Sequence, residues 1–94
     1  MFTFKHKKFL KNQPMIINIA RGQVLDEKFI IYCMKRKLIK NIGLDVFEKE
    51  PIDKKNRLLK FNNSFYSAHN AFNTIESVER TNARVIENLI KGLK

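Results

Sequence analysis

Short apolar runs alternate with segments of helical period along most of the chain. Residues 15–20, Met-Ile-Ile-Asn-Ile-Ala, form a nearly continuous apolar run of strand length, which is typical of a strand covered on both faces in a parallel sheet. Similar short runs predict a second strand over residues 41–46 and a third over residues 64–68. The pattern therefore favours an α/β protein with a small parallel sheet.

Two segments have the apolar spacing of amphipathic helices. The first is predicted over residues 26–37, with Asp26 as its N-cap and cations in its last turn. The second is a long final helix, for which Asn73 is the predicted N-cap and Glu76 the N3 residue of a capping box. Its apolar stripe consists of Val78, Val85, Ile86, Leu89, Ile90 and Leu93.

The order strand, helix, strand, loop, strand, helix describes the trailing part of a doubly wound parallel sheet. We divide the chain into a lead-in of residues 1–14, a β-α-β-loop-β core of residues 15–72 and a C-terminal helix of residues 73–94. The lead-in is expected to be a short helical or irregular segment, and residues 58–61 a single helical turn. One domain, or one half of a domain, accounts for the whole pattern.

Composition adds a strong positive charge, because 19 Lys and Arg residues oppose nine Asp and Glu residues. A formal charge of +10 raises the alternative of a small basic module that binds nucleic acid. Lysines are concentrated in the lead-in, whereas cations and carboxylates are interspersed elsewhere, so we interpret the excess as a solvated surface. We expect no nucleic-acid partner and no metal site.

The single Cys33 cannot form an internal disulfide, and its apolar neighbours predict a small buried side chain in a reducing compartment. No apolar run approaches the roughly 20 residues that cross a bilayer. The N-terminus also lacks the features of a signal peptide. We therefore expect a cytoplasmic protein with no membrane contact.

Three residues that could perform chemistry each follow a predicted strand. Arg21 comes directly after the first strand and precedes a glycine, so its guanidinium should lie at the carboxyl edge of the sheet, where ligands collect. A planar guanidinium suits a carboxylate ligand better than a lysine does. The alternative is an ordinary surface arginine in a turn.

His69 follows the third strand, where an imidazole could exchange a proton with a substrate oxygen near neutral pH. Glu50, beside Pro51, could accept a hydrogen bond from the far ring nitrogen and thereby fix the tautomer. The alternative for a single histidine in this position is a structural role. Together the two residues have the character of an acid-base group and the carboxylate that orients it.

The segments 18–22 (Asn-Ile-Ala-Arg-Gly), 44–51 (Leu-Asp-Val-Phe-Glu-Lys-Glu-Pro) and 69–74 (His-Asn-Ala-Phe-Asn-Thr) occur in this order. With them the chain resembles the C-terminal part of the D-isomer-specific 2-hydroxyacid dehydrogenases. The resemblance covers about residues 8–94 and implies a partial Rossmann-type, dinucleotide-binding domain. It also implies hydride transfer between a nicotinamide cofactor, NAD or NADP, and a small 2-hydroxy or 2-oxo acid.

The same resemblance implies a role for each matching residue. Arg21 would bind the substrate, His69 would be the acid-base catalyst, and Glu50 would be its partner. Asp45 matches an acidic residue near the nicotinamide carboxamide. Ala20, Arg21, His69 and Ala71 would also border the cofactor cleft, with Asn70 and Phe72 beside it.

Two departures from the family pattern bear on activity. Ala68 stands where the family typically has a proline before the histidine, which leaves the backbone there less constrained. The chain also contains no Gly-x-Gly-x-x-Gly segment to hold a dinucleotide pyrophosphate. We therefore expect a truncated enzyme that is inactive alone, with the missing N-terminal portion or a second copy as partner. A non-catalytic interaction module is a further alternative.

Overall fold

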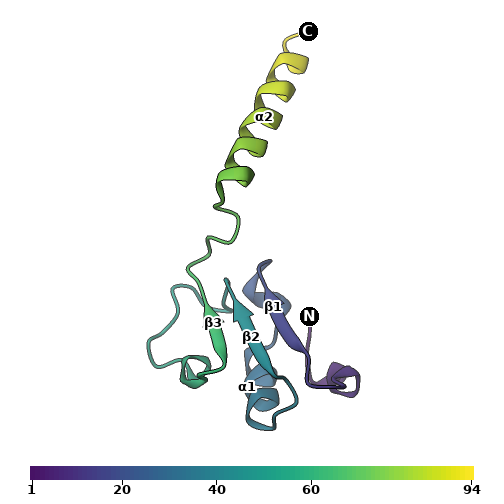
Figure 1. The fold of residues 1–94 in the computed structure, drawn as a ribbon, viewed down its shortest axis with the longest axis vertical. Coiled ribbons are helices and arrows are strands. Elements are labelled where there is room, and N and C mark those ends of the chain that lie inside the picture. The colour runs from purple at the N-terminus through teal and green to yellow at the C-terminus, as the bar shows by residue number, and fades with distance from the viewer.

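Three parallel strands form the single sheet of the computed structural model, which describes residues 1–94. The strands β1 (Met15–Asn18), β2 (Asn41–Leu44) and β3 (Ser64–Tyr66) lie in the order β1-β2-β3. Figure 1 shows the carboxyl ends of the strands at one edge, from which the chain continues to the C-terminal helix. The α/β class and the parallel sheet predicted from the sequence are confirmed, with each strand two residues shorter than expected.

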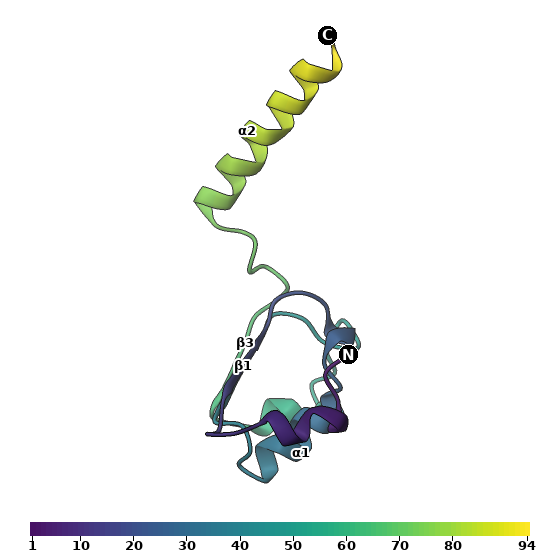
Figure 2. The same ribbon diagram turned by 90° about the vertical axis from the view of Figure 1, so that its right-hand side faces the viewer.

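Helix α1 (Glu27–Lys35) connects β1 to β2 and covers one face of the sheet (Figure 2). It begins after Asp26, whose carboxylate accepts hydrogen bonds from the backbone N–H groups of Lys28 and Phe29. This side chain satisfies two of the free N–H groups in the first turn. The predicted N-cap and the predicted helix are both confirmed, to within two residues at the C-terminal end.

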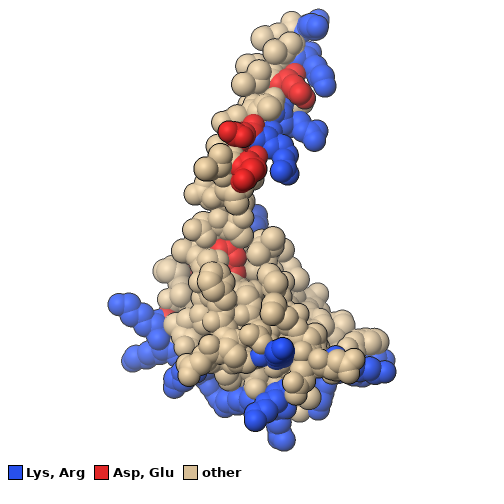
Figure 3. Space-filling view, viewed as in Figure 1, with Lys and Arg blue, Asp and Glu red and all other residues tan.

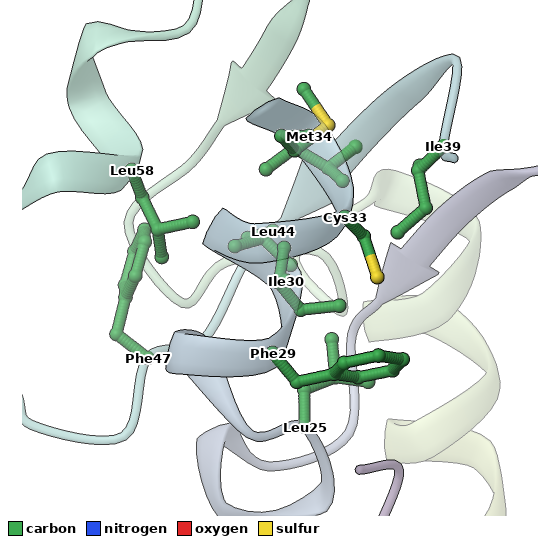
Figure 4. Packing of buried hydrophobic residues seen from close by; sticks show 10 residues of the cluster. Leu25, Phe29, Ile30, Cys33, Met34, Ile39, Leu44, Phe47 and Leu58 are labelled. Atoms are coloured by element: carbon green, nitrogen blue, oxygen red, sulfur yellow. The ribbon is translucent and has the colours of Figure 1, made fainter. Parts of the chain in front are cut away.

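The hydrophobic core lies between α1 and the sheet (Figure 4). Phe29, Cys33 and Leu58 are fully buried there, so α1 and the loop before β3 pack against the same face. Cys33 is the small buried side chain that the sequence predicts. Burial raises the pKa of its thiol to about 11, which keeps it protonated and unreactive at neutral pH.

The opposite face of the sheet is open in this chain. Met15, Ile17 and Phe65 point away from α1, and their exposed fractions lie between 59% and 72%. The prediction that the first strand is covered on both faces is therefore wrong for this structure. The physical reason is that residues of a strand alternate between its two faces, and no element of these 94 residues packs on the second face.

The lead-in forms the 3-10 helix η1 (Phe4–Phe9), which packs beside α1. The rings of Phe2 and Phe29 lie 5.4 Å apart, and those of Phe4 and Tyr32 lie 5.2 Å apart. Two further 3-10 turns, η2 (Gly22–Val24) and η3 (Arg57–Lys60), follow β1 and precede β3. The single turn expected near residues 58–61 is thus present.

Helix α2 (Ile75–Gly92) projects from the carboxyl edge of the sheet, and none of its residues is buried. Its N-cap is Thr74, whose hydroxyl accepts from the Ser77 N–H at 3.1 Å, so the prediction of Asn73 and Glu76 is wrong by one residue. Asn73 instead closes a turn by donating its N–H to the Asn70 carbonyl.

The apolar stripe of α2 therefore lacks a partner in this chain. The radius of gyration is 17.4 Å. About 12 Å would be expected for a compact domain of this length. Neither helix has the length and hydropathy of a membrane span.

Candidate functional site

The turn after β1 places Arg21 at the carboxyl edge of the sheet. The buried Asn18 side chain organises this turn: its Nδ2 donates to the Arg21 carbonyl at 2.9 Å, and its Oδ1 accepts from the Ala20 N–H at 3.1 Å. The Arg21 guanidinium is exposed and donates to the Ala20 carbonyl at 2.8 Å. The turn thus holds the backbone and leaves most guanidinium donors free for a ligand.

Gly22 brings this turn against the segment that follows β2. A Cβ atom on Gly22 would lie 1.8 Å from the carbonyl oxygen of Phe47 and 2.5 Å from the nitrogen of Glu48. Only a glycine permits so close an approach of two backbones. The Phe47–Glu48 segment is fixed in turn to the start of α1, because Glu27 and Glu48 each accept the other's backbone N–H, at 2.9 and 2.7 Å.

Glu50 connects the segment after β2 to the histidine. One carboxylate oxygen accepts from the Phe47 N–H at 2.9 Å, and the other lies 3.3 Å from Nδ1 of His69. The Phe47 N–H lowers the pKa of Glu50, the nearby His69 and Arg21 lower it further, and partial burial opposes them. Glu50 is therefore ionised at neutral pH and can keep the Nδ1 proton on the imidazole.

The structure brings Arg21, Glu50 and His69 together around one cavity of about 400 Å³, with Gly22 and Glu48 also in its lining. Each of the three follows a different strand of the same sheet. The side chains of Glu50 and His69 are 40% and 43% exposed, so the ion pair faces open space rather than the core. A guanidinium, an oriented imidazole and space for a small acid thus share one edge.

Asp45 lies beneath this edge and is 3% exposed. Its carboxylate accepts hydrogen bonds from the Ser67 hydroxyl and from the backbone N–H groups of Asn70 and Ala71, at 3.0 and 2.9 Å. The Ser67 hydroxyl lowers the pKa of Asp45 most, the Ala71 and Asn70 amides lower it further, and burial opposes them. In this structure the carboxylate organises the loop after β3.

The remaining predicted cofactor residues lie on the same edge. Ala20 and Ala71 are exposed, and Ala71 lines a second cavity of about 640 Å³ together with Asp45 and the open face of the sheet. A cofactor role for Ala20, Asp45 and Ala71 stays a prediction. No group of three or more His, Cys, Asp or Glu residues could hold a metal ion.

Sequence reasoning missed the structural roles of Asn18, Gly22 and Ser67. Gly22 and Ser67 act through partners far away in the sequence, whereas Asn18 acts within its own turn, on Ala20 and Arg21. The one signal for Gly22 in the sequence was its position directly after Arg21. The one signal for Ser67 was its position two residues before His69.

Lys and Arg side chains gather around the end of the domain away from α2, at the amino ends of the strands, and a second set lies along α2 among Glu side chains (Figure 3). The positive excess is thus largely separate from the cavity at the carboxyl edge. The exception on that edge is Arg21, with Lys49 beside it in the cavity lining.

Comparison with known proteins bears on the family and the fold of the chain. Residues 1–71 match the family model of the D-isomer specific 2-hydroxyacid dehydrogenase, NAD binding domain. A relative in Dictyostelium discoideum, described as a probable 2-ketogluconate reductase, is 36% identical over 98% of this chain and 28% of its own length. The chain thus spans about a quarter of the length of the curated relatives it matches.

Two solved structures show the same similarity in three dimensions. A glyoxylate reductase from Paecilomyes thermophila superposes with a TM-score of 0.73 and 28% identity, over 94% of this chain and 27% of its own. The NADPH-dependent glyoxylate/hydroxypyruvate reductase of Sinorhizobium meliloti, in complex with NADP and malonate, gives a TM-score of 0.61 and 32% identity over 69% of this chain and 20% of its own.

Proposed function

The chain belongs to the D-isomer-specific 2-hydroxyacid dehydrogenase family, and we propose that it supplies the acid-binding and proton-transferring half of such an enzyme's nucleotide-binding domain. One observation carries the proposal: Arg21, Glu50 and His69 line a single cavity at the carboxyl edge of the sheet. The substrate class is a small 2-oxo acid, or the corresponding 2-hydroxy acid in the reverse direction. The basic-module and interaction-module alternatives gain no support from the similarities found.

Each side chain performs a step that its chemistry allows. Arg21 binds the carboxylate of the acid through two parallel hydrogen bonds and keeps the neighbouring carbonyl near the imidazole. His69 donates a proton to the carbonyl oxygen in the reducing direction and accepts it from the hydroxyl in the oxidising direction. Glu50 holds the ring through Nδ1, so that Nε2 is the nitrogen available to the substrate.

The nicotinamide cofactor supplies the hydride when bound. The residues present fit the nicotinamide end of that group, since Ala20 and Ala71 are exposed on the carboxyl edge and Ala71 and Asp45 line the second cavity there. They do not fit the pyrophosphate, because these 94 residues contain no Gly-x-Gly-x-x-Gly turn. We therefore propose that this chain alone binds NAD or NADP weakly and turns over only with the rest of the dehydrogenase fold.

Complementation tests the proposal. The portion of the Paecilomyes thermophila glyoxylate reductase that this chain does not match would be produced separately, mixed with the 94-residue chain and assayed with glyoxylate by NADH and NADPH consumption. We expect turnover from the mixture and not from either piece.

Site variants then tie the turnover to the proposed residues. Arg21→Ala should raise KM for glyoxylate, and His69→Gln should remove turnover. Arg36→Ala and His6→Gln, which change the same residue types away from the site, should keep it. Full turnover by both site variants would refute the assignment.

A further inference from the structure

We infer that Ser67 and Asp45 are a positioning pair for His69, and that their hydrogen bond replaces the constraint that Ala68 does not provide. The inference rests on the proposed function, in which His69 exchanges the proton. Neither residue lines the cavity of Arg21 or hydrogen-bonds to the imidazole, but both line a neighbouring cavity of about 460 Å³ with Glu50 and His69.

The backbone at His69 is the first observation. His69 has φ of 55°, in the left-handed region that side chains other than glycine rarely adopt. Such a conformation persists only where neighbouring contacts determine it. This turn aims the imidazole back toward Glu50, which comes from the segment after a different strand.

Contacts to the end of β2 are what determine this turn. The Ser67 N–H donates to the Leu44 carbonyl at 3.0 Å, and the His69 N–H donates to the Asp45 carbonyl at 2.9 Å. The Asp45 carboxylate then accepts the next two N–H groups, those of Asn70 and Ala71. The residues on both sides of His69 are therefore bound to one buried side chain.

Ser67 completes the set of donors to that carboxylate. Its hydroxyl is the one side-chain donor to Asp45, and it shares the oxygen Oδ1 with the Asn70 N–H. Without it, the buried carboxylate would keep only the two amide donors that follow His69, and no bond to it would remain from the residues that precede His69. A proline at position 68 would fix the φ of residue 68 through its ring. With Ala68, the backbone before His69 is restrained by these hydrogen bonds instead.

The imidazole responds to this turn because its own surroundings are open. The charged groups that face it are Glu50, Arg21, Glu48 and Lys49 from the cavity, and Asp45 from beneath the loop. Only Glu50 is within hydrogen-bonding distance of the ring. A small rotation of the turn would therefore break the one contact that fixes the tautomer.

Ser67→Ala tests the inference, with Ser67→Thr as the rescuing variant that keeps the hydroxyl. Ser64→Ala is the matched control, because the Ser64 hydroxyl is buried but makes no hydrogen bond. The imidazole ¹⁵N shifts of the 94-residue chain report the tautomer of His69, and His6→Gln removes the signals of the other histidine. We expect Ser67→Ala to shift His69 from one tautomer to a mixture, and Ser67→Thr and Ser64→Ala to leave it unchanged.

The complemented enzyme gives the second measurement. Displacing a catalytic group by about an ångström lowers kcat roughly 10- to 100-fold. We expect Ser67→Ala to lose kcat on that scale with little change in KM for glyoxylate, and Ser67→Thr to recover most of it. Unchanged tautomer and kcat in Ser67→Ala would overturn the inference, even where His69→Gln has removed turnover and the proposed function stands. Retained turnover in His69→Gln would instead refute the proposed function.

Discussion

Replacing Gly22 by alanine would place a Cβ atom in the contact between the turn after β1 and the segment after β2, on which the site depends. The new Cβ would lie 1.8 Å from the Phe47 carbonyl oxygen and 2.0 Å from its carbon, whereas real Cβ contacts essentially never fall under 3.0 Å. Both colliding atoms belong to the backbone, so no side chain can rotate away. The turn after β1 and the segment after β2 would have to separate by more than an ångström.

The expected loss of stability follows from the cost of this backbone collision. Overpacking a well-packed region costs about 1–3 kcal/mol, and a backbone collision belongs at the upper end of that range. A domain of this size has a total stability of only about 5–14 kcal/mol, at the usual value per residue. For such a domain each kcal/mol lowers Tm by about 4–8 °C, so we expect a loss of at least about 10 °C for Gly22→Ala.

Thermal and urea unfolding followed by circular dichroism would measure the change, and the chain offers two matched controls. At Gly43 an added Cβ would meet the Ile17 side chain at an ordinary 3.6 Å, and at Gly92 it would meet nothing within 4 Å. Gly43→Ala should therefore leave Tm nearly unchanged. Gly92→Ala should raise the helix signal of α2, by a local gain of up to about 1 kcal/mol, without altering core unfolding.

The three variants make the same chemical change at three positions, so the loss of a glycine alone cannot account for a large drop in Tm that is confined to Gly22→Ala. Stability of Gly22→Ala within 1 kcal/mol of the wild type would show that the two segments are not in contact. The convergence of Arg21 with Glu50 and His69 would then lose its structural basis.

Three further outcomes are expected. Leu58→Ala should lower the unfolding free energy by about 2–5 kcal/mol in urea titrations, because the side chain is fully buried, whereas Leu59→Ala at a partly exposed neighbour should cost much less. Cys33 should react with a thiol reagent only at the rate of unfolding, and faster reaction in native buffer would contradict its burial. The pKa of Asp45 is lower in the folded state than its ordinary 3.8, so its stabilising contribution is complete above that value and is lost as pH falls through the folded pKa. Asp45→Asn should therefore destabilise the chain at pH 7 and weaken the dependence of stability on pH below about 4, and an unchanged acid profile would count against the role of this carboxylate.

Local patterns in the sequence were sufficient to predict the helices and strands. The period of apolar residues and a single capping aspartate predicted α1, because both signals depend on neighbours within one turn. The predicted N-cap of α2 was wrong because signals within one turn do not separate two adjacent capping residues. Asn73 and Thr74 are both good capping residues, and the choice between them depends on the turn closed by Asn70, which contacts within the fold determine.

The grouping of the site could also be predicted, because residues that follow parallel strands meet at one edge. The hydrogen bonds that hold these site residues in place could not be predicted from the sequence. Asn18 acts on residues two and three positions away, whereas Gly22 and Ser67 act on segments 22 to 26 residues away. A short polar residue or a glycine is common beside a strand whether or not it makes such a contact. The open face of the sheet was missed because a continuous apolar run indicates a buried strand whether or not the covering element belongs to the same chain.

The segment after β2 explains why a chain with an open sheet face can still hold a defined site. β2 is the central strand, and the residues directly after it contact both neighbours: Asp45 binds the loop that carries His69, while Phe47 contacts Gly22 and binds Glu50. These contacts all lie at the carboxyl edge and involve no residue of α2. The apolar surfaces that lack partners are on the other face of the sheet and on α2, so covering them would stabilise the domain without being needed to form the edge itself. Arg21, Glu50 and His69 are therefore expected to keep their relative positions when the rest of a dehydrogenase fold is supplied.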